Sequence, residues 1–420
     1  MITDMVMARS SATRPDRGDA DGASHGAIWY LGWGALLLAL CYAVLRVGLG
    51  IVAAGSAPSF ALKIAPNNAE ALVGMSTQAM ASLTPEGVRR SADFARRAYL
   101  REPVSAAALR QIGFATEAER GPNRARPLLR QAAALSRRDF ETQLWLIEDA
   151  VNRGDVAEAL RHYDIALRAS KRAPQILFGP LTAATSDPAL ILPLAQTIVR
   201  QPPWGNTFLL QAASTSNAPG NMVRLIAILL AAGYPVTPLA IQSLEGRLIQ
   251  AGDYRHAWAL FAAAFPSARR DTIRNPRFQD MVSEGLAFGW SFDVDGSATG
   301  VVIDDRNGRR LGYNAPVGTG GVVARQMLLL PPGTYRLSSK VMSNNHAGDS
   351  APVWRLRCVG QNKDLGELPL PVVTGTPQRV QALVTVTRCP AQWLELVLAA
   401  TDDPDGIAGA VSDIDLVRVR

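Results

Sequence analysis

Histidine and cysteine are scarce in this sequence of 420 residues, which has four His and three Cys. It contains no His-Glu-x-x-His pair, no Walker loop and no Cys-x-x-Cys motif, so zinc protease, nucleotide-binding and dithiol redox chemistry have no support. No metal-ligand set or cofactor motif is recognisable. These absences predict a protein that is not an enzyme, although a pair of distant carboxylates for glycoside hydrolysis stays open as an alternative.

The three cysteines divide into one and a pair. Cys41 lies in an apolar run, where it serves as a small apolar residue. Cys358 and Cys389 lie close together in the C-terminal segment, and they would form one disulfide in an oxidising compartment. Two buried free thiols are the alternative reading of the same pair.

Long apolar runs are also rare, with one exception near the N-terminus. No charged residue interrupts the stretch from Ala27 to Leu45, which as a helix is roughly 28 Å long, close to the ~30 Å hydrocarbon core of a bilayer. We therefore expect a disordered tail at 1–26 and a transmembrane anchor at 27–54. Lys and Arg are more frequent before this run than directly after it, which favours an N-terminus inside. Signal-peptide cleavage near residue 54 is the alternative, disfavoured by the length of the run.

Charge of one sign is in excess, since the chain has a formal net charge of +7. The excess lies in residues 64–280, where it could meet an acidic polymer, anionic lipid headgroups or an acidic protein. Arg on solvated helix faces is the simpler explanation, because Arg is a good helix former. Nucleic acid is not expected as a partner, because most of the chain should lie outside the cytoplasm.

The segment 59–280 is rich in Ala, Leu and Arg, and its apolar residues recur at the three- and four-residue spacing of amphipathic helices. The phrase Gly154-Asp155 before a helix returns as Gly252-Asp253, and small residues recur about every 34 residues. This pattern resembles the tetratricopeptide repeat. The resemblance implies an all-α solenoid that binds a protein partner, with degenerate repeats in the Pro-rich centre and helix packing through Ala98, Ala133, Ala159, Tyr163, Ala257 and Phe261.

From residue 286 to 420 the apolar spacing changes to period two, with turn clusters between short runs, which predicts an all-β sandwich. The phrases Leu328–Tyr335 and Ser412–Val417 resemble those of jelly-roll carbohydrate-binding modules. That resemblance implies sugar binding by aromatic and planar polar side chains, for which the candidates are Trp290, Tyr313, Asn344, Asn345 and His346. For Trp290, burial in the core is favoured over a role as a sugar platform.

Two further features of this segment have mainly structural readings. Trp354 and Trp393 stand within apolar strands, and we expect both in the core. The cluster Asp402, Asp403 and Asp405 could hold calcium, but an Asp-Pro-Asp-Gly turn needs no metal.

The predicted fold class is thus multidomain: one N-terminal transmembrane helix, a tetratricopeptide-like solenoid and a jelly-roll-like sandwich. This order resembles accessory proteins of bacterial exopolysaccharide or O-antigen assembly. The resemblance implies a single-pass inner-membrane protein with its bulk in the periplasm, acting as a scaffold for a protein partner and for an acidic polysaccharide. A general envelope assembly factor whose sandwich binds protein, and a cryptic glycan-active enzyme, are the alternatives.

Overall fold

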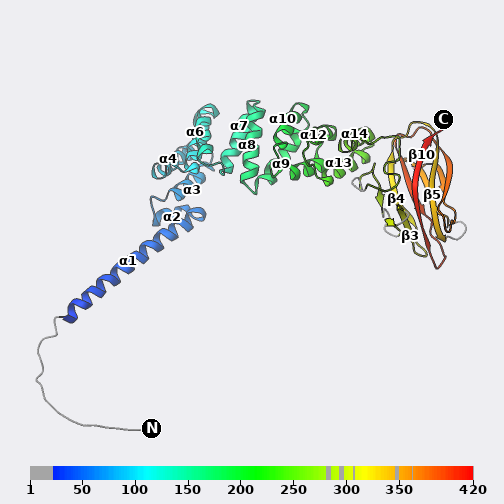
Figure 1. Cartoon of the computed structure of the whole chain (residues 1–420). Helices are drawn as coiled ribbons and strands as arrows, with labels where there is room; N and C mark the ends of the chain where they lie inside the picture. The colour runs from blue at the N-terminus through cyan, green and yellow to red at the C-terminus, as the bar shows by residue number, and fades with distance from the viewer. Residues whose placement is uncertain are drawn as a thin grey trace, which may run out of the picture. The chain divides into compact units, whose positions relative to one another are not determined.

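The computed structural model describes residues 22–280, 285–292, 298–305, 308–345, 350–361 and 363–419. The chain divides into two compact units, Met1–Asp149 and Ala150–Arg420. The described residues form helices first and strands afterwards, so the multidomain organisation expected from the sequence is confirmed (Figure 1).

One helix of the described part is long and apolar enough to cross a membrane. Helix α1 runs from Gly22 to Ser56, and its stretch Trp33–Ser56 has a mean hydropathy of 2.3 with almost no burial inside the protein. Length and composition alone support this statement, and a signal sequence would satisfy the same criteria.

The first unit continues with short helices that pack as neighbours. They are α2 (Pro58–Ile64), α3 (Ala69–Met80), α4 (Pro85–Arg101), α5 (Ala106–Arg120), α6 (Pro122–Leu135) and the larger part of α7 (Phe140–Asn152), whose last three residues belong to the second unit. Each of α3 to α5 packs against the following helix, and α3 also packs against α5. Buried polar pairs fix this arrangement: Arg110 binds Asp139 at 2.6 Å, and Arg126 binds Asp149 at 2.7 Å. Both carboxylates are nearly inaccessible to solvent, so these pairs specify the helix register.

The second unit begins with helices that pack against the next helix but one. They are α8 (Val156–Ala169), α9 (Ala173–Ala184), α10 (Pro188–Ile198), α11 (Gly205–Thr215), α12 (Pro219–Ala231), α13 (Pro238–Gln250) and α14 (Tyr254–Ala264). The pairs α9 with α11, α10 with α12, α11 with α13 and α12 with α14 are in contact, which is the pattern of stacked hairpins. The Pro-rich centre is helical. Four of its helices carry Pro in the first turn, where no N–H donor is needed, and α9 and α10 also contain Pro180 and Pro193 in their interiors.

The two Gly-Asp phrases each start a helix. Gly154 and Gly252 adopt positive φ angles of 71° and 73°, which favour glycine, and end the preceding helix. The side chain of Asp155 accepts the N–H of Glu158 at 2.9 Å and so caps the start of α8. The side chain of Asp253 accepts the N–H of His256 at 3.2 Å and caps the start of α14 in the same way. The residues expected to pack between helices are buried, namely Ala98, Ala159, Tyr163, Ala257 and Phe261, whereas Ala133 is half-buried.

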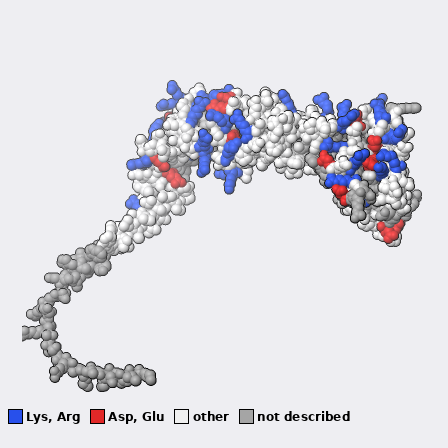
Figure 2. Space-filling view, in the orientation of Figure 1, with Lys and Arg blue, Asp and Glu red and all other residues white. Residues whose placement is uncertain are grey.

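Charge is unevenly spread over the helices. Between residues 173 and 244 the only charged side chains are Asp187, Arg200 and Arg224. In the view of Figure 2 the surface over α9–α12 is accordingly almost free of blue and red atoms, whereas arginines crowd α4–α8. The basic excess of residues 64–280 is therefore concentrated before residue 173 and after residue 246.

The C-terminal strands form two five-stranded antiparallel sheets. One has the order β1-β4-β9-β6-β7 and the other β2-β3-β10-β5-β8. The strands are β1 (Ser291–Phe292), β2 (Thr299–Asp305), β3 (Gly308–Ala315), β4 (Gly321–Leu328), β5 (Gly333–Asn345), β6 (Val353–Cys358), β7 (Lys363–Pro369), β8 (Gln378–Val386), β9 (Gln392–Leu398) and β10 (Ile407–Arg418). Alternate residues of both sheets face a common apolar core, as a sandwich requires.

The linker between α14 and β1 belongs partly to the sandwich. Ile273 and Phe278 are buried in the sandwich core. Gln326 of β4 accepts the N–H of Arg274 at 2.8 Å and donates to its carbonyl at 3.1 Å, and Ile414 donates to the carbonyl of Pro276 at 3.1 Å. The last helix thus ends at Ala264, ahead of the expected limit at 280, and packing of the sandwich starts before residue 286.

Candidate ligand-binding site

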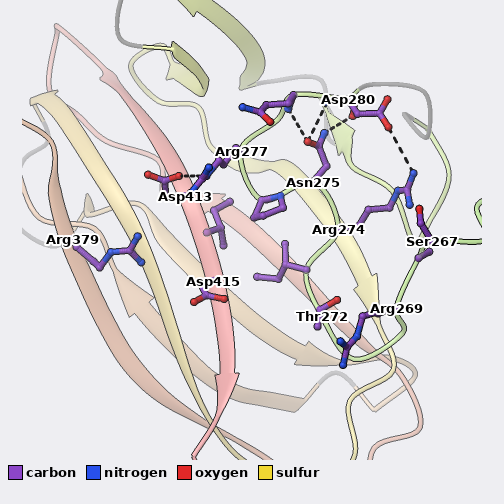
Figure 3. A pocket seen from close by; sticks show the side chains of 15 residues that line it. Ser267, Arg269, Thr272, Arg274, Asn275, Arg277, Asp280, Arg379, Asp413 and Asp415 are labelled. Carbon is purple, nitrogen blue, oxygen red and sulfur yellow. Dashed lines mark hydrogen bonds and ion pairs between the residues drawn. The ribbon is translucent and has the colours of Figure 1, made fainter.

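The linker and the outer face of the β10 sheet enclose the pocket shown in Figure 3, which we call the linker pocket. Its volume is about 690 Å³. Four arginines and three aspartates line it, from the linker and from β8 and β10: Arg269, Arg274, Arg277, Arg379, Asp280, Asp413 and Asp415. No aromatic side chain of the described residues takes part in this lining.

Asp413 is the best-anchored acid of the linker pocket. It lies where the pairing of β10 with β5 becomes irregular, between Ser412 and Asp415, and its φ of 47° is one that Asp tolerates. Its carboxylate accepts Lys340 at 2.6 Å and Arg277 at 2.9 Å. The hydrogen bond from Lys340, with the charge of Arg277, holds the pKa of Asp413 below its ordinary value, against the opposing effect of partial burial.

The linker arginines differ in how firmly they are held. The Arg274 guanidinium lies over the rings of Phe261 and Phe265, at 5.3 and 4.4 Å from their centroids, and burial lowers its pKa. Arg277 is mostly exposed beside Asp413. Arg379 comes from the opposite side of the pocket, where it donates to Ser338 at 2.8 Å.

Together these groups offer many hydrogen-bond donors around an open space. A guanidinium presents its N–H groups in a planar fork that matches a carboxylate, and it also binds neighbouring hydroxyls. The aspartates of the same lining add hydrogen-bond acceptors. The linker pocket is therefore suited to a polar or anionic ligand that is bound by hydrogen bonds and not by ring stacking.

Two of the residues expected to stack on sugar are core residues, and this expectation is wrong for both. Trp290 is 2% exposed, packs against Trp354 and Phe278 at centroid distances of 5.8 and 5.3 Å, and donates to the carbonyl of Asn275. Tyr313 is 3% exposed on the inner face of β3, and burial raises its pKa to about 12. Burial of a large aromatic side chain at an inward position of a strand or linker lowers the free energy of the folded state more than exposure to solvent does.

The other sugar candidates lie at the end of β5. Asn344 and Asn345 close that strand, and Asn345 faces Ala408 of β10, but their side chains fall outside the described part, as does His346 altogether. Asn314, next to Tyr313, pairs with the same Ala408 from the other side. The backbone thus brings Tyr313, Asn344 and Asn345 to one end of the same sheet, while Trp290 lies elsewhere in the core.

The remaining expectations for this segment divide. Trp354 is fully buried, as expected, but Trp393 is only half-buried, stands on the outer face of β9 and carries the Arg325 guanidinium 4.7 Å from its ring centroid. Alternation along β9 explains this position, because Leu394 and Leu396 occupy the inner face. Cys358 and Cys389 form a disulfide in the structure.

No calcium-like cluster emerges from the acidic turn. Asp403 accepts the N–H of Asp405 at 3.0 Å, as in an Asx turn. Among the described residues no group of three or more His, Cys, Asp and Glu could hold a metal ion.

Sequence reasoning missed the residues of the linker pocket. Arg277, Arg379 and Asp413 come from three separate segments, and no local spacing joins them. The one available clue was the alternation Asp413, Asp415 in the last strand, which places two acids on the outer face of the sheet.

No protein-family model matches the chain, and no curated protein matches it. Among solved structures, the chain is similar to TmCBM61 in complex with β-1,4-galactotriose, with 14% identity over 36% of this chain and 99% of that one and a TM-score of 0.25. It is also similar to the CBM22-1 xylan-binding domain of Paenibacillus barcinonensis Xyn10C, with 11% identity over 37% and 98% of the two chains and a TM-score of 0.27.

Longer proteins also match part of the chain. The arabinose-bound MgGH51 α-L-arabinofuranosidase matches with 14% identity over 35% of this chain and a TM-score of 0.28, but the chain spans only 26% of that enzyme. Scores this low carry no conclusion about ligand or activity. The sandwich assignment depends on the observed sheets and their order.

Proposed function

We propose that this protein is a membrane-anchored, non-catalytic scaffold in the assembly of an exopolysaccharide or O-antigen, and that its sandwich binds the polysaccharide. The linker pocket carries this proposal, because its arginines and aspartates match the hydroxyl and carboxylate groups of a glycan. Helix α1 supplies the anchor, and the helical hairpins supply an extended surface for a protein partner, as stacked repeats do.

The proposed topology places the bulk of the chain in the periplasm. A disulfide between Cys358 and Cys389 supports an oxidising compartment. A periplasm-dependent phosphatase fused after Arg420 should be active in cells, and an inactive but intact fusion would contradict this orientation.

Glycan binding is tested on the full chain in detergent micelles by affinity electrophoresis in gels that contain a uronate polymer or a neutral dextran. Arg277→Gln combined with Arg379→Gln removes two charges from the linker pocket, and we expect at least a tenfold loss of affinity. The control combines Arg101→Gln with Arg89→Gln on α4, outside the pocket, and changes the net charge equally. Equal retardation of both double variants and the parent protein would contradict the assignment of the linker pocket.

A further inference from the structure

A second cleft, of about 560 Å³, opens between the start of α14 and two loops of the sandwich. We call it the junction cleft. One wall is made by the first turns of α14 together with Arg270 of the linker, and the other by the segments 329–331 and 389–390. None of these residues lines the linker pocket.

Two aromatic side chains share the α14 wall of the junction cleft. Tyr254 and Trp258 are four residues apart on the helix, so they lie on the same face, and both are half-buried. Trp258 is held by Phe261 and Phe288, whose ring centroids are 5.7 and 5.2 Å from its own. The cleft therefore has a fixed aromatic wall, which the linker pocket does not have.

The charge in the junction cleft is positive. Arg255 and Arg270 are both exposed side chains that line it. The charge of Arg255 acts on Asp253, the acid next to it in the lining, and both guanidinium groups are open to solvent. The one acid of the lining, Asp253, is already engaged, because it accepts the N–H of His256 at 3.2 Å and contacts its Nδ1 at 2.6 Å. Two guanidinium groups thus remain for a ligand.

The facing wall is rigid. Gln392 is completely buried, accepts the N–H of Leu330 at 2.8 Å and donates to the carbonyl of Cys389 at 2.8 Å, so it ties the two loops together. The disulfide of Cys389 and the hydrogen bond from Leu329 to the carbonyl of Arg270, at 3.1 Å, add two more attachments. A ligand would thus meet a preformed cleft, which reduces the entropy lost on binding.

We propose that the junction cleft binds a uronic acid unit of an acidic polysaccharide. The C–H face of the sugar ring would lie against Tyr254 or Trp258, and its carboxylate would accept hydrogen bonds from Arg255 and Arg270. A neutral sugar would use the aromatic wall but leave both guanidinium groups without an anion. This inference rests on the proposed function for the polymeric nature of the ligand, but it concerns a different site.

The test uses the full chain in detergent micelles, titrated calorimetrically with a galacturonate hexamer, a neutral maltohexaose and hexaglutamate. Arg270→Gln and Tyr254→Ala are the variants of the junction cleft. Arg269→Gln, at the adjacent residue, is the variant of the linker pocket, because Arg269 lines only that pocket. Arg101→Gln on α4, outside both pockets, is the charge-matched control. Arg270 is exposed and outside the core, so its replacement should leave the fold intact, which circular dichroism checks.

We expect the galacturonate hexamer to bind at least tenfold more tightly than maltohexaose, and each junction variant to lose at least tenfold in affinity. Unchanged affinity in both junction variants with a loss in Arg269→Gln would overturn the junction cleft and leave the proposed function standing. Equal binding of hexaglutamate would overturn the assignment to sugar, since charge alone would then be recognised. Absence of binding by the parent protein to either saccharide would overturn both proposals.

Discussion

Glu245 of α13 couples the helices to the sandwich through a buried carboxyl group. It is 2% exposed, and its Oε2 accepts the N–H of Ala287 at 2.8 Å, just ahead of β1. Burial raises its pKa from 4.5 to about 7, although the N–H groups of Ala287 and Phe288 act in the opposite direction. At neutral pH this carboxyl is thus close to half-ionised in the folded protein.

The sign of the pH effect follows from this raised pKa. Between pH 4.5 and 7 the folded state keeps a proton that the unfolded state has lost, so stability falls as pH rises through this window. A shift of this size corresponds to about 3 kcal/mol, which is present below pH 4.5 and lost above pH 7. Glu245→Gln keeps the shape of the protonated form and cannot ionise.

Hydrogen exchange of the full chain in detergent, followed by mass spectrometry on peptides spanning Ala287 and Phe288, measures this effect. We expect the parent protein and Glu245→Gln to differ by less than about 1 kcal/mol at pH 5, and at pH 8.5 an opening free energy that is about 3 kcal/mol higher in the variant. Gln242→Glu serves as a comparison, because it places a carboxyl on the same helix beside the carbonyl of Gly285. Parallel protection of parent and Glu245→Gln from pH 5 to 8.5 would refute the reasoning.

Three other outcomes are expected. Arg110→Met leaves the buried carboxylate of Asp139 without the Nη1 group that donates to both of its oxygens, and should lower the unfolding free energy of the first unit by roughly 3 kcal/mol. Arg110→Met combined with Asp139→Asn should recover part of this loss. Urea unfolding checks this, and a single variant as stable as the parent would contradict it. Trp354→Ala removes a fully buried side chain beside Trp290 and should cost roughly 3–5 kcal/mol, visible as faster amide exchange in β9; unchanged exchange there would show that the core repacks without loss. Reduction of the disulfide, whose cysteines are 31 residues apart, should destabilise the sandwich by about 4 kcal/mol in a thermal melt. A Cys358→Ala, Cys389→Ala double variant has no disulfide to lose. If reductant lowered its stability by the same amount, loss of the disulfide would not be the cause of the destabilisation.

Local patterns were sufficient for the elements of this fold. Period two from residue 286 onward predicted strands, and the Gly-Asp phrases predicted helix starts at α8 and α14 because a glycine that ends one helix and an aspartate that caps the next act within a few residues. The Pro-rich centre was read as degenerate because Pro is unfavourable inside helices. Pro174, Pro188 and Pro219 occupy first turns, however, and α9 and α10 accommodate Pro180 and Pro193 in their interiors.

The sites depended on contacts that no local pattern contains. The choice between core and surface for Trp290 depended on the linker residue Phe278, which completes the core around it. Trp393 was expected inside because its strand is apolar on both sides, and only the alternation of β9 shows that it faces outward. Both candidate clefts join the linker to parts of the sandwich more than 50 residues away, so their lining could not be derived before the fold was known.

The attachment of the linker has a practical consequence for anyone isolating the sandwich. A fragment that starts at residue 286 would lack Ile273 and Phe278, and with them the side chains that close one end of its interior. Such a fragment would expose the edge of Trp290 to water and would lose the partner of Gln326. If such a fragment were poorly soluble or failed to bind a ligand, the cause would be the chosen boundary of the fragment. The result would not contradict ligand binding by the intact protein.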